Sequence, residues 1–333
     1  MESIQVVFTG VRKVELQLLP RPSIGPEEVL LRTEHTLISP GTELAMYEGT
    51  HIALPDPENL FAKYPHRPGY AAVGRVEEIG ASVKGIAVGD RLLFLGQHAS
   101  WAKLNPAHAL WVPVPKNVDI DVLLMARLAQ ISLTARYCFR RQPARCIVLG
   151  AGLIGIFAAQ ALKIWGVRNV VVQDVSAPRL ELARRCGIER TVLAEGAGLA
   201  ASVKALGAEP DGIIEATGIP GLVSEALAAI GRGGDVILLG SSRGLATIDA
   251  YKHVHRKGAA LIGAHECSIP DHAEPPQICR QKTLEMTVDW VKSGQIQVAG
   301  LVTHSIRFEE IAGMYERMAH DKQGVLGVVV RWT

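Results

Sequence analysis

The sequence predicts a two-domain α/β protein, in which a β-rich first third precedes a parallel sheet with helices on both faces. Three observations support this class. Short runs of alternating apolar and polar residues, broken by Pro and Gly, fill the first third. From Cys146 onward, almost wholly apolar strands alternate with helical segments. The glycine-rich turn GAGLIG joins the first of those strands to its helix.

The composition fits a folded globular protein. The chain has 333 residues, 48% of them hydrophobic and 20% charged, enough to bury the cores of roughly two domains. Lys and Arg total 35 against 33 Asp and Glu, so no long-range field favours a nucleic acid or an anionic membrane. The five cysteines form no Cys-x-x-Cys pair, and the first residues lack a signal-peptide pattern. We expect a cytoplasmic protein with a small-molecule partner, and no nucleic-acid or membrane partner.

The first third predicts an antiparallel or barrel-like β unit rather than βαβ repeats. Its strand-like runs stand at 14–20, 28–34, 71–80 and 90–96. Residues 80–90 predict a tight turn between two of these strands. Residues 119–142 then place apolar residues at helical spacing and end in a basic turn, as a helix C-terminus prefers.

The central part repeats strand and helix. Apolar runs begin at Cys146, Asn169, Thr191, Asp211, Asp235 and Ala260. The stretch 146–166 is about as long as a membrane span, but its glycines after a β-branched run favour a buried strand, turn and helix. Strands that are apolar throughout predict a parallel sheet covered on both faces. Beyond Cys267 we expect a helix, a short strand, a helix and a terminal strand, at 284–295, 301–306, 308–320 and 324–332.

The turn after the first of these apolar strands predicts a dinucleotide site. Gly150, Gly152 and Gly155 form a G-x-G-x-x-G pattern between a strand and a helix, with Asp174 at the end of the next strand. Glycines let the backbone approach a pyrophosphate. We expect its charge to lie at the helix N-terminus, next to Leu153 and Ile154. Asp174 is expected to accept hydrogen bonds from the ribose hydroxyls, and its charge repels a 2′-phosphate. This favours NAD over NADP. A ligand-free turn and a flavin site are the alternatives.

The whole chain resembles the medium-chain dehydrogenase/reductase superfamily, which includes zinc-dependent alcohol, sorbitol and threonine dehydrogenases and zinc-free quinone and enoyl reductases. The stretches that carry the resemblance are 38–49, 68–92, 148–166, 170–187, 211–218 and 303–316. It implies a GroES-like β-rich catalytic domain and a Rossmann doubly wound parallel sheet, with the substrate in the cleft between them. The domain boundaries that it implies are 1–120 with 270–333, a connecting helix at about 119–142, and 143–269. A homodimer or homotetramer is also expected from the resemblance.

The zinc ligands of the superfamily do not match this sequence. Zinc-dependent members carry a Cys where this chain has Pro40, a His-Glu pair where it has Tyr70 and Ala71, and a third ligand where it has Gln130. The cysteine-rich lobe that holds a structural zinc in many members is replaced by a stretch without cysteine after Phe94. Zinc needs about three protein donors. We therefore predict that the protein binds no metal.

Without a metal, side chains must handle the substrate proton. The resemblance makes Thr42 a proton relay in the cleft, unless it is a turn residue that bonds its own backbone. Histidine as a residue type titrates near neutrality, so His98 is a candidate proton carrier, or else a solvated loop residue. Tyr70 stands at a lost ligand position and either points its hydroxyl at the vacant place or fills it with its ring. Glu43 is expected to orient His98 or bind a substrate hydroxyl, or to pair with a neighbouring Arg or Lys.

The resemblance also implies further cofactor contacts. Arg179 is expected against the adenosine ribose, and Thr134 against the carboxamide. Small residues after the later strands are expected beside the nicotinamide, where they allow close backbone approach, namely Thr217, Gly218, Gly240, Ser241, Gly263 and Ala264. An ordinary turn after a strand is the alternative for each glycine.

The leading hypothesis is a zinc-independent, NAD-dependent dehydrogenase that acts reversibly on a secondary hydroxyl of a polyol, sugar, cyclitol or similar metabolite. The relatives that oxidise the hydroxyethyl group of bacteriochlorophyllides share the Ile38–Glu43 pattern, but such a substrate needs a wide apolar cleft that the sequence does not indicate. A zinc-free NAD(P)H-dependent quinone or enoyl reductase is the main alternative. A non-catalytic binding protein is a third.

Overall fold

The computed structural model describes residues 2–194 and 198–332, and within it the chain divides into two compact units. The first unit contains the chain up to Arg127, together with Pro270–Lys292 and the chain from Val302 onward. The second contains Leu128–Ile269 and Ser293–Leu301. The predicted α/β class, with a β-rich part and a parallel sheet, is confirmed.

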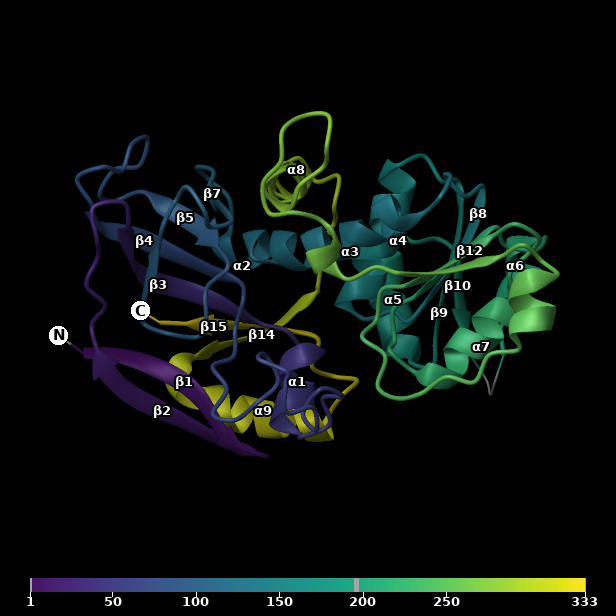
Figure 1. The fold of residues 1–333 in the computed structure, drawn as a ribbon, viewed down its shortest axis with the longest axis horizontal. Coiled ribbons are helices and arrows are strands. Elements are labelled where there is room, and N and C mark those ends of the chain that lie inside the picture. Colours follow the sequence, from purple (N-terminus) through teal and green to yellow (C-terminus); the bar gives the residue numbers. More distant parts are fainter. Residues whose placement is uncertain (1, 195–197, 333) are drawn as a thin grey trace. The chain divides into compact units, whose positions relative to one another are not determined.

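The first unit is built around a mixed sheet. Its strands run in the order β14-β15-β3-β4-β5-β7, and β6 pairs with β3. The strand bounds are β3 Val29–Ile38, β4 Ala72–Ile79, β5 Arg91–Phe94, β6 Trp101–Leu104, β7 Trp111–Pro113, β14 Val302–Arg307 and β15 Gly327–Arg331. β15 pairs antiparallel with β3, so strands from the two ends of the chain lie side by side (Figure 1).

A hairpin and several helices complete this unit. β1 (Glu2–Gly10) and β2 (Lys13–Pro20) form the hairpin, and the helices are α1 Thr42–Tyr47, α2 Ile120–Leu123, α8 Arg280–Lys292, η3 Phe308–Glu310 and α9 Ile311–His320. The apolar face of α9 packs on β1, α1 and β15, in a cluster that includes Phe8, Met46, Tyr315 and Val328. Figure 1 shows α9 beside the hairpin and α1.

The second unit holds a parallel sheet of strand order β10-β9-β8-β11-β12-β13. Its strands are β8 Arg145–Leu149, β9 Asn169–Asp174, β10 Thr191–Leu193, β11 Gly212–Glu215, β12 Asp235–Leu238 and β13 Ala260–Gly263. Strand order reverses between β8 and β11, the place where doubly wound sheets bind dinucleotides.

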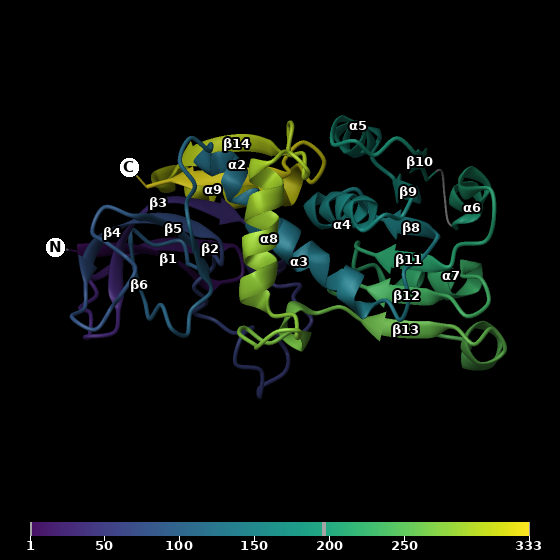
Figure 2. The ribbon, with the colours of Figure 1, turned by 90° about the horizontal axis from the view of Figure 1, so that it is seen from above.

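Helices cover both faces of this sheet. They are α4 Leu153–Ile164, α5 Ala177–Arg185, α6 Ala200–Leu206 and α7 Pro220–Ala229, with the short turns η1 Ala250–His255 and η2 Glu266–Ser268. Figure 2 shows α4 and α5 on one face and α6 and α7 on the other. The central strands are mostly apolar because helices shield both of their faces from water.

The long helix expected at 119–142 is interrupted. Asp119 caps α2 by accepting the backbone N–H of Asp121, and the chain turns at Leu124 before α3 (Met125–Cys138) begins. Apolar spacing continues across the turn, which is why the sequence pattern does not show the break. Within residues 2–194 and 198–332, no helix is long and apolar enough to cross a membrane.

Candidate active site

A buried acid–base pair lies inside the first unit. His98 is 0% exposed and Glu43 is 1% exposed, and His98 Nε2 lies 3.0 Å from Glu43 Oε2. The other ring nitrogen, Nδ1, lies 2.7 Å from Thr36 Oγ1. The alternative of a solvated loop histidine is therefore wrong, and the side-chain partners of Glu43 in the structure include His98.

The backbone around His98 explains why the imidazole is buried. Its N–H donates to the Pro68 carbonyl over 2.9 Å, and its carbonyl accepts the N–H of Val6 over 2.9 Å. Gly69 has φ +102, and a Cβ on it would lie 2.6 Å from the His98 nitrogen. Only glycine fits there, so the glycine before Tyr70 is required by the close approach of the loop that carries His98.

Three hydroxyl groups gather beside this pair. Tyr70 donates its hydroxyl to Ser39 Oγ, and it also shares a hydrogen bond with the Thr42 side chain. The Ser39 backbone N–H donates to Glu43 Oε1 over 2.9 Å, which connects the hydroxyl cluster to the acid–base pair. Thr42 begins α1 and is half-buried. We call Ser39, Thr42 and Tyr70 the hydroxyl cluster.

Electrostatics keep the Tyr70 hydroxyl protonated. Burial first, and the nearby Glu43 charge second, raise the pKa of Tyr70 to about 12. The ring of Tyr70 also lies 5.3 Å from the Arg127 guanidinium, and its carbonyl accepts Arg127 Nε over 3.3 Å. The ring therefore lies against Arg127 and the hydroxyl points into the polar cluster, and the role of Tyr70 at the lost ligand position stays a prediction.

The residues at the zinc-ligand positions do not fit a zinc ion. Pro40 and Ala71 carry no donor atom, and the Tyr70 hydroxyl is engaged by Ser39 and Thr42. In the described ranges, no group of three or more His, Cys, Asp or Glu side chains could hold a metal ion.

The turn after β8 has the shape that a dinucleotide needs. Gly150 has φ +98, and a Cβ on Gly155 would lie 1.8 Å from the Gly150 carbonyl oxygen, so close packing of turn and helix excludes any side chain there. A Cβ on Gly152 would meet nothing within 4 Å. Gly152 precedes α4, whose N-terminal N–H groups receive no side-chain cap. The open space and the free N–H groups suit a phosphate.

Asp174 ends β9 next to this turn. Its Oδ2 accepts the Ala151 backbone N–H over 2.6 Å, and its Oδ1 accepts the Ser176 N–H over 2.8 Å. Each carboxylate oxygen has a second lone pair, so the group keeps capacity for ribose hydroxyls. Asp174 is therefore a candidate to bind the ribose, and it also stabilises the glycine-rich turn.

A third segment approaches the same turn from β11. Glu215 is 1% exposed, and its Oε1 accepts the backbone N–H of Thr217 over 2.7 Å and that of Gly218 over 3.1 Å. Burial raises the pKa of Glu215, while these hydrogen bonds oppose the shift. A Cβ on Gly240 would lie 2.6 Å from the Gly218 nitrogen. Glu215 therefore fixes two loops that were predicted to line the nicotinamide.

The remaining predicted cofactor residues also lie in the second unit. Leu153 and Ile154 open α4, Arg179 is half-buried on α5, and Thr134 is buried on α3. Ser241 follows β12, Gly263 ends β13, and Ala264 comes directly after it. Only Ser241 and Gly263 among them are exposed. Their roles toward a cofactor stay predictions.

Four residues that join the pair to its surroundings were missed from the sequence. Tyr315 donates its hydroxyl to Glu43 Oε2, and Trp332 Nε1 donates to Thr36 Oγ1 over 3.0 Å. Ser39 and Thr36 are the other two. Tyr315 lies 272 residues from Glu43 along the chain, and no local pattern links them.

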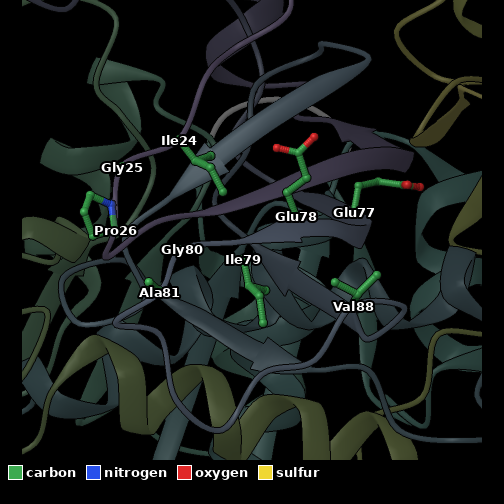
Figure 3. Close-up of a pocket in the computed structure, with 9 residues that line it drawn as sticks. All are labelled: Ile24, Gly25, Pro26, Glu77, Glu78, Ile79, Gly80, Ala81 and Val88. Atoms are coloured by element: carbon green, nitrogen blue, oxygen red, sulfur yellow. The ribbon is translucent and has the colours of Figure 1, made fainter.

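An open hollow on the first unit is unrelated to these groups. Residues 24–26 and 77–81 line it together with Val88 (Figure 3). None of them is a predicted site residue, and Glu78 is paired with Arg21 over 2.6 Å. We do not assign the chemistry to this hollow.

Comparisons with known proteins agree with this arrangement. The family model described as alcohol dehydrogenase GroES-like domain matches residues 25–108, and that described as zinc-binding dehydrogenase matches residues 154–281. L-threonine 3-dehydrogenase of Pseudoalteromonas atlantica is 26% identical, covering 93% of this chain and 94% of its own length. Sorbitol dehydrogenase of Arabidopsis thaliana is 23% identical, covering 97% and 94%.

A solved structure has the same fold. It is the short chain alcohol dehydrogenase rspB from E. coli CFT073 complexed with NADH, with a TM-score of 0.82, 20% identity and 99% of both chains covered. The fold and the two family models thus define a dehydrogenase built of two units. The chain matches the two domain families of the medium-chain dehydrogenase/reductase superfamily, and it is an oxidoreductase of the alcohol dehydrogenase class, EC 1.1.1.-.

Proposed function

We propose that this protein is a zinc-independent, NAD-dependent dehydrogenase that oxidises a secondary hydroxyl of a polyol, sugar, cyclitol or similar metabolite, and reduces the ketone in reverse. The observation that carries the proposal is the buried Glu43–His98 pair joined to the hydroxyl cluster. Both belong to the segments in which zinc-dependent relatives carry metal ligands. A proton-accepting group therefore stands where the family uses a metal.

The second unit supplies the cofactor site in this proposal. Bound NAD supplies a nicotinamide that accepts a hydride from the substrate carbon. The open space at Gly152 and the N-terminus of α4 hold the pyrophosphate, and Asp174 accepts the ribose hydroxyls. The negative charge of Asp174 opposes a 2′-phosphate, which is our reason for proposing NAD rather than NADP.

The first unit handles the proton. The pKa of Tyr70 is raised to about 12, so its hydroxyl stays protonated near neutral pH. It serves as a hydrogen-bond donor to the substrate oxygen and not as a base. The hydroxyl cluster is held beside the pair by the Ser39 N–H bond to Glu43, and in the proposal its hydroxyls bind the substrate oxygen. The proton of the substrate hydroxyl is accepted by the Glu43–His98 pair.

The relatives support the substrate class. Those named for L-threonine and sorbitol act on small molecules that carry hydroxyl groups, and the superfamily chemistry is their oxidation. Several hydroxyl donors and acceptors in the hydroxyl cluster suit a substrate with more than one hydroxyl. The proposal therefore places polyols, sugars and cyclitols first.

An activity panel tests the proposal. Purified protein is assayed with NAD and with NADP against polyols, sugars, cyclitols, quinones and enones, and we expect NAD reduction with at least one polyhydroxylated substrate. His98→Ala is expected to lower turnover by roughly 10²–10⁴. His108→Ala, which removes an exposed histidine of the same unit, serves as the control and is expected to behave as wild type.

Two results would overturn the proposal. A strong NADPH preference with turnover only on activated C=C bonds would make the protein a quinone or enoyl reductase instead. Wild-type turnover of His98→Ala would remove the Glu43–His98 pair from the chemistry.

A further inference from the structure

Two hydrogen-bond donors from the C-terminal part of the chain close off the Glu43–His98 pair. The Tyr315 hydroxyl, from α9, donates to Glu43 Oε2. The Trp332 indole, just after β15, donates to Thr36 Oγ1, which in turn contacts His98 Nδ1. Tyr315 is 0% exposed and Trp332 is 7% exposed. The pair is therefore held from both ends by groups that water does not replace.

The donor and acceptor capacities of these groups decide which atom carries each proton. An indole N–H can only donate, so Thr36 Oγ1 accepts from Trp332 and keeps its own hydroxyl proton for His98 Nδ1. An ionised Glu43 can only accept, so the proton between it and His98 belongs to Nε2. Neutral His98 is thus held as the Nε2–H tautomer, and Nδ1 is the atom that can gain a proton.

We propose that Tyr315 and Trp332 are positioning residues for proton transfer, which fix the tautomer of His98 and the number of donors on Glu43. In this way they set the pH at which the pair takes up the substrate proton. The inference rests on the proposed function, in which the pair accepts that proton. The C–H electron pair leaves with the hydride for the nicotinamide, the O–H proton reaches the pair, and the substrate C=O bond forms.

The other titratable groups near the pair do not compete for this proton near neutral pH. Burial and Glu43 raise the pKa values of both Tyr70 and Tyr315, so both phenols stay protonated. Arg127, which lies over the Tyr70 ring, stays charged. His66 is another imidazole that senses the Glu43 charge; burial lowers its pKa, and the Glu43 charge opposes that shift. Separate observation of each histidine distinguishes His66 from His98.

The structure offers a matched control for Tyr315. Tyr47 stacks on Tyr315, with ring centroids 5.6 Å apart, and both rings pack against Phe8. The Tyr47 hydroxyl instead donates to Glu316, on the outer side of α9. Replacement of either tyrosine by Phe removes one hydroxyl from the same aromatic cluster, but only Tyr315→Phe removes a donor from Glu43.

The experiment compares Tyr315→Phe, Tyr47→Phe and wild type by two measurements. The first is a pH titration of ¹⁵N-histidine-labelled protein by NMR, which reports the tautomer and protonation of each ring without any substrate. The second is the pH profile of kcat with NAD and the best substrate of the activity panel. Trp332→Phe, which keeps the ring but removes the N–H, is included in case Tyr315→Phe does not fold.

We expect His98 to be the Nε2–H tautomer in the wild-type protein. Loss of the Tyr315 donor makes the Glu43 carboxylate more basic. Tyr315→Phe should therefore move both the His98 titration and the acid limb of the kcat profile upward by about one pH unit. The KM for NAD should stay unchanged. Tyr47→Phe should move neither. In Trp332→Phe the Nδ1 signal of His98 should change, because the Thr36 hydroxyl is released.

Three outcomes decide the matter. An Nδ1–H tautomer in the wild type, or a folded Tyr315→Phe that titrates as wild type, overturns the inference. Shifts in the NMR titration and in the kcat profile together support it. If the NMR titration shifts but the wild type reduces NAD with no substrate of the panel, the positioning of the pair is supported and the proposed function fails.

Discussion

Asp174 is held in place by hydrogen bonds from its own chain. Both carboxylate oxygens accept backbone N–H groups, one of them from the glycine-rich turn. This arrangement costs no conformational entropy when a ribose binds, because the side chain is already ordered. It also means that a substitution there affects the turn as well as the ligand.

Asp174→Ala tests the first of these roles. The variant should bind NAD about 10- to 100-fold more weakly, because the ribose hydroxyls lose a charged acceptor worth roughly 1–3 kcal/mol. Isothermal titration calorimetry measures the affinity directly. Asp249→Ala, which removes an exposed carboxylate from the cap of η1, should leave the affinity unchanged. Equal NAD affinity of Asp174→Ala and wild type would contradict the ribose contact.

Single residues could be predicted only where a short pattern or a resemblance marked them. Glu43, Tyr70 and His98 were named from the sequence, and the structure brings His98 and Glu43 together. Tyr315 and Trp332 could not be found in this way, since their contacts depend on the pairing of β15 with β3 and on the docking of α9. A polar atom on an otherwise apolar helix face is the one signal that could have pointed to Tyr315.

At the scale of elements, two glycines of the β8 turn and α4 differ in the space around them. Gly155 packs against the Gly150 carbonyl, whereas Gly152 faces open space. Gly155→Ala should destabilise the protein by about 3 kcal/mol or more, or leave it insoluble, because a Cβ cannot enter that contact.

Gly152→Ala is the matched counterpart. Its φ of −75° suits alanine, so its free energy of unfolding should stay within about 0.5 kcal/mol of wild type. Its NAD affinity should fall, because the new methyl group occupies the space proposed for the pyrophosphate. Denaturant unfolding and NAD titration of both variants check the pair. Wild-type NAD affinity in Gly152→Ala would exclude this space as the phosphate site.

A polar cluster at Asp121 predicts a pH dependence for the first unit. Its Oδ1 lies 2.6 Å from His35 Nδ1 on β3, and Oδ2 accepts from Arg331 on β15 over 3.0 Å. His35 chiefly, and Arg331 in addition, lower the pKa of Asp121. A carboxylate whose folded pKa is lowered stabilises the fold above its unfolded pKa, and loses that contribution as pH falls through the folded pKa.

Asp121→Asn should therefore be less stable than wild type at pH 7, by about 1–3 kcal/mol, and the difference should shrink below pH 4. Urea unfolding at several pH values measures both. Asp271→Asn, which breaks a more exposed ion pair with Arg280, should cost no more than about 1 kcal/mol. A difference that is the same at every pH would show that Asp121 acts only through packing.

Most elements could be predicted because apolar periodicity decides them locally. The strand and helix alternation from β8 to β13 follows from continuous apolar runs and amphipathic segments. The break between α2 and α3 could not be predicted, because burial on both sides of Leu124 keeps the pattern apolar. The first turn of the expected helix at 308–320 is a 3₁₀ turn, a distinction that residue spacing does not make.

At the scale of the whole molecule, the absence of suitable zinc donors at four family positions is a property of the entire site. We expect the purified protein to contain far less than one zinc per chain by elemental analysis. Prolonged treatment with EDTA and 1,10-phenanthroline should change neither turnover nor Tm, because the proposed mechanism uses no metal. Loss of turnover that added zinc restores would refute the zinc-independent mechanism.

The order of strands along the chain has a consequence for biosynthesis. Residues 36–98 leave the ribosome first, the whole nucleotide unit follows, and the β15 strand that completes the first sheet comes last. Glu43 and Tyr315 are 272 residues apart, which at ordinary elongation rates means about 14–54 s between their synthesis. During that interval β3 has an open edge that another nascent chain can pair with. The cell must shield this edge, so the yield of native protein should respond to chaperone supply more than the folded stability would suggest.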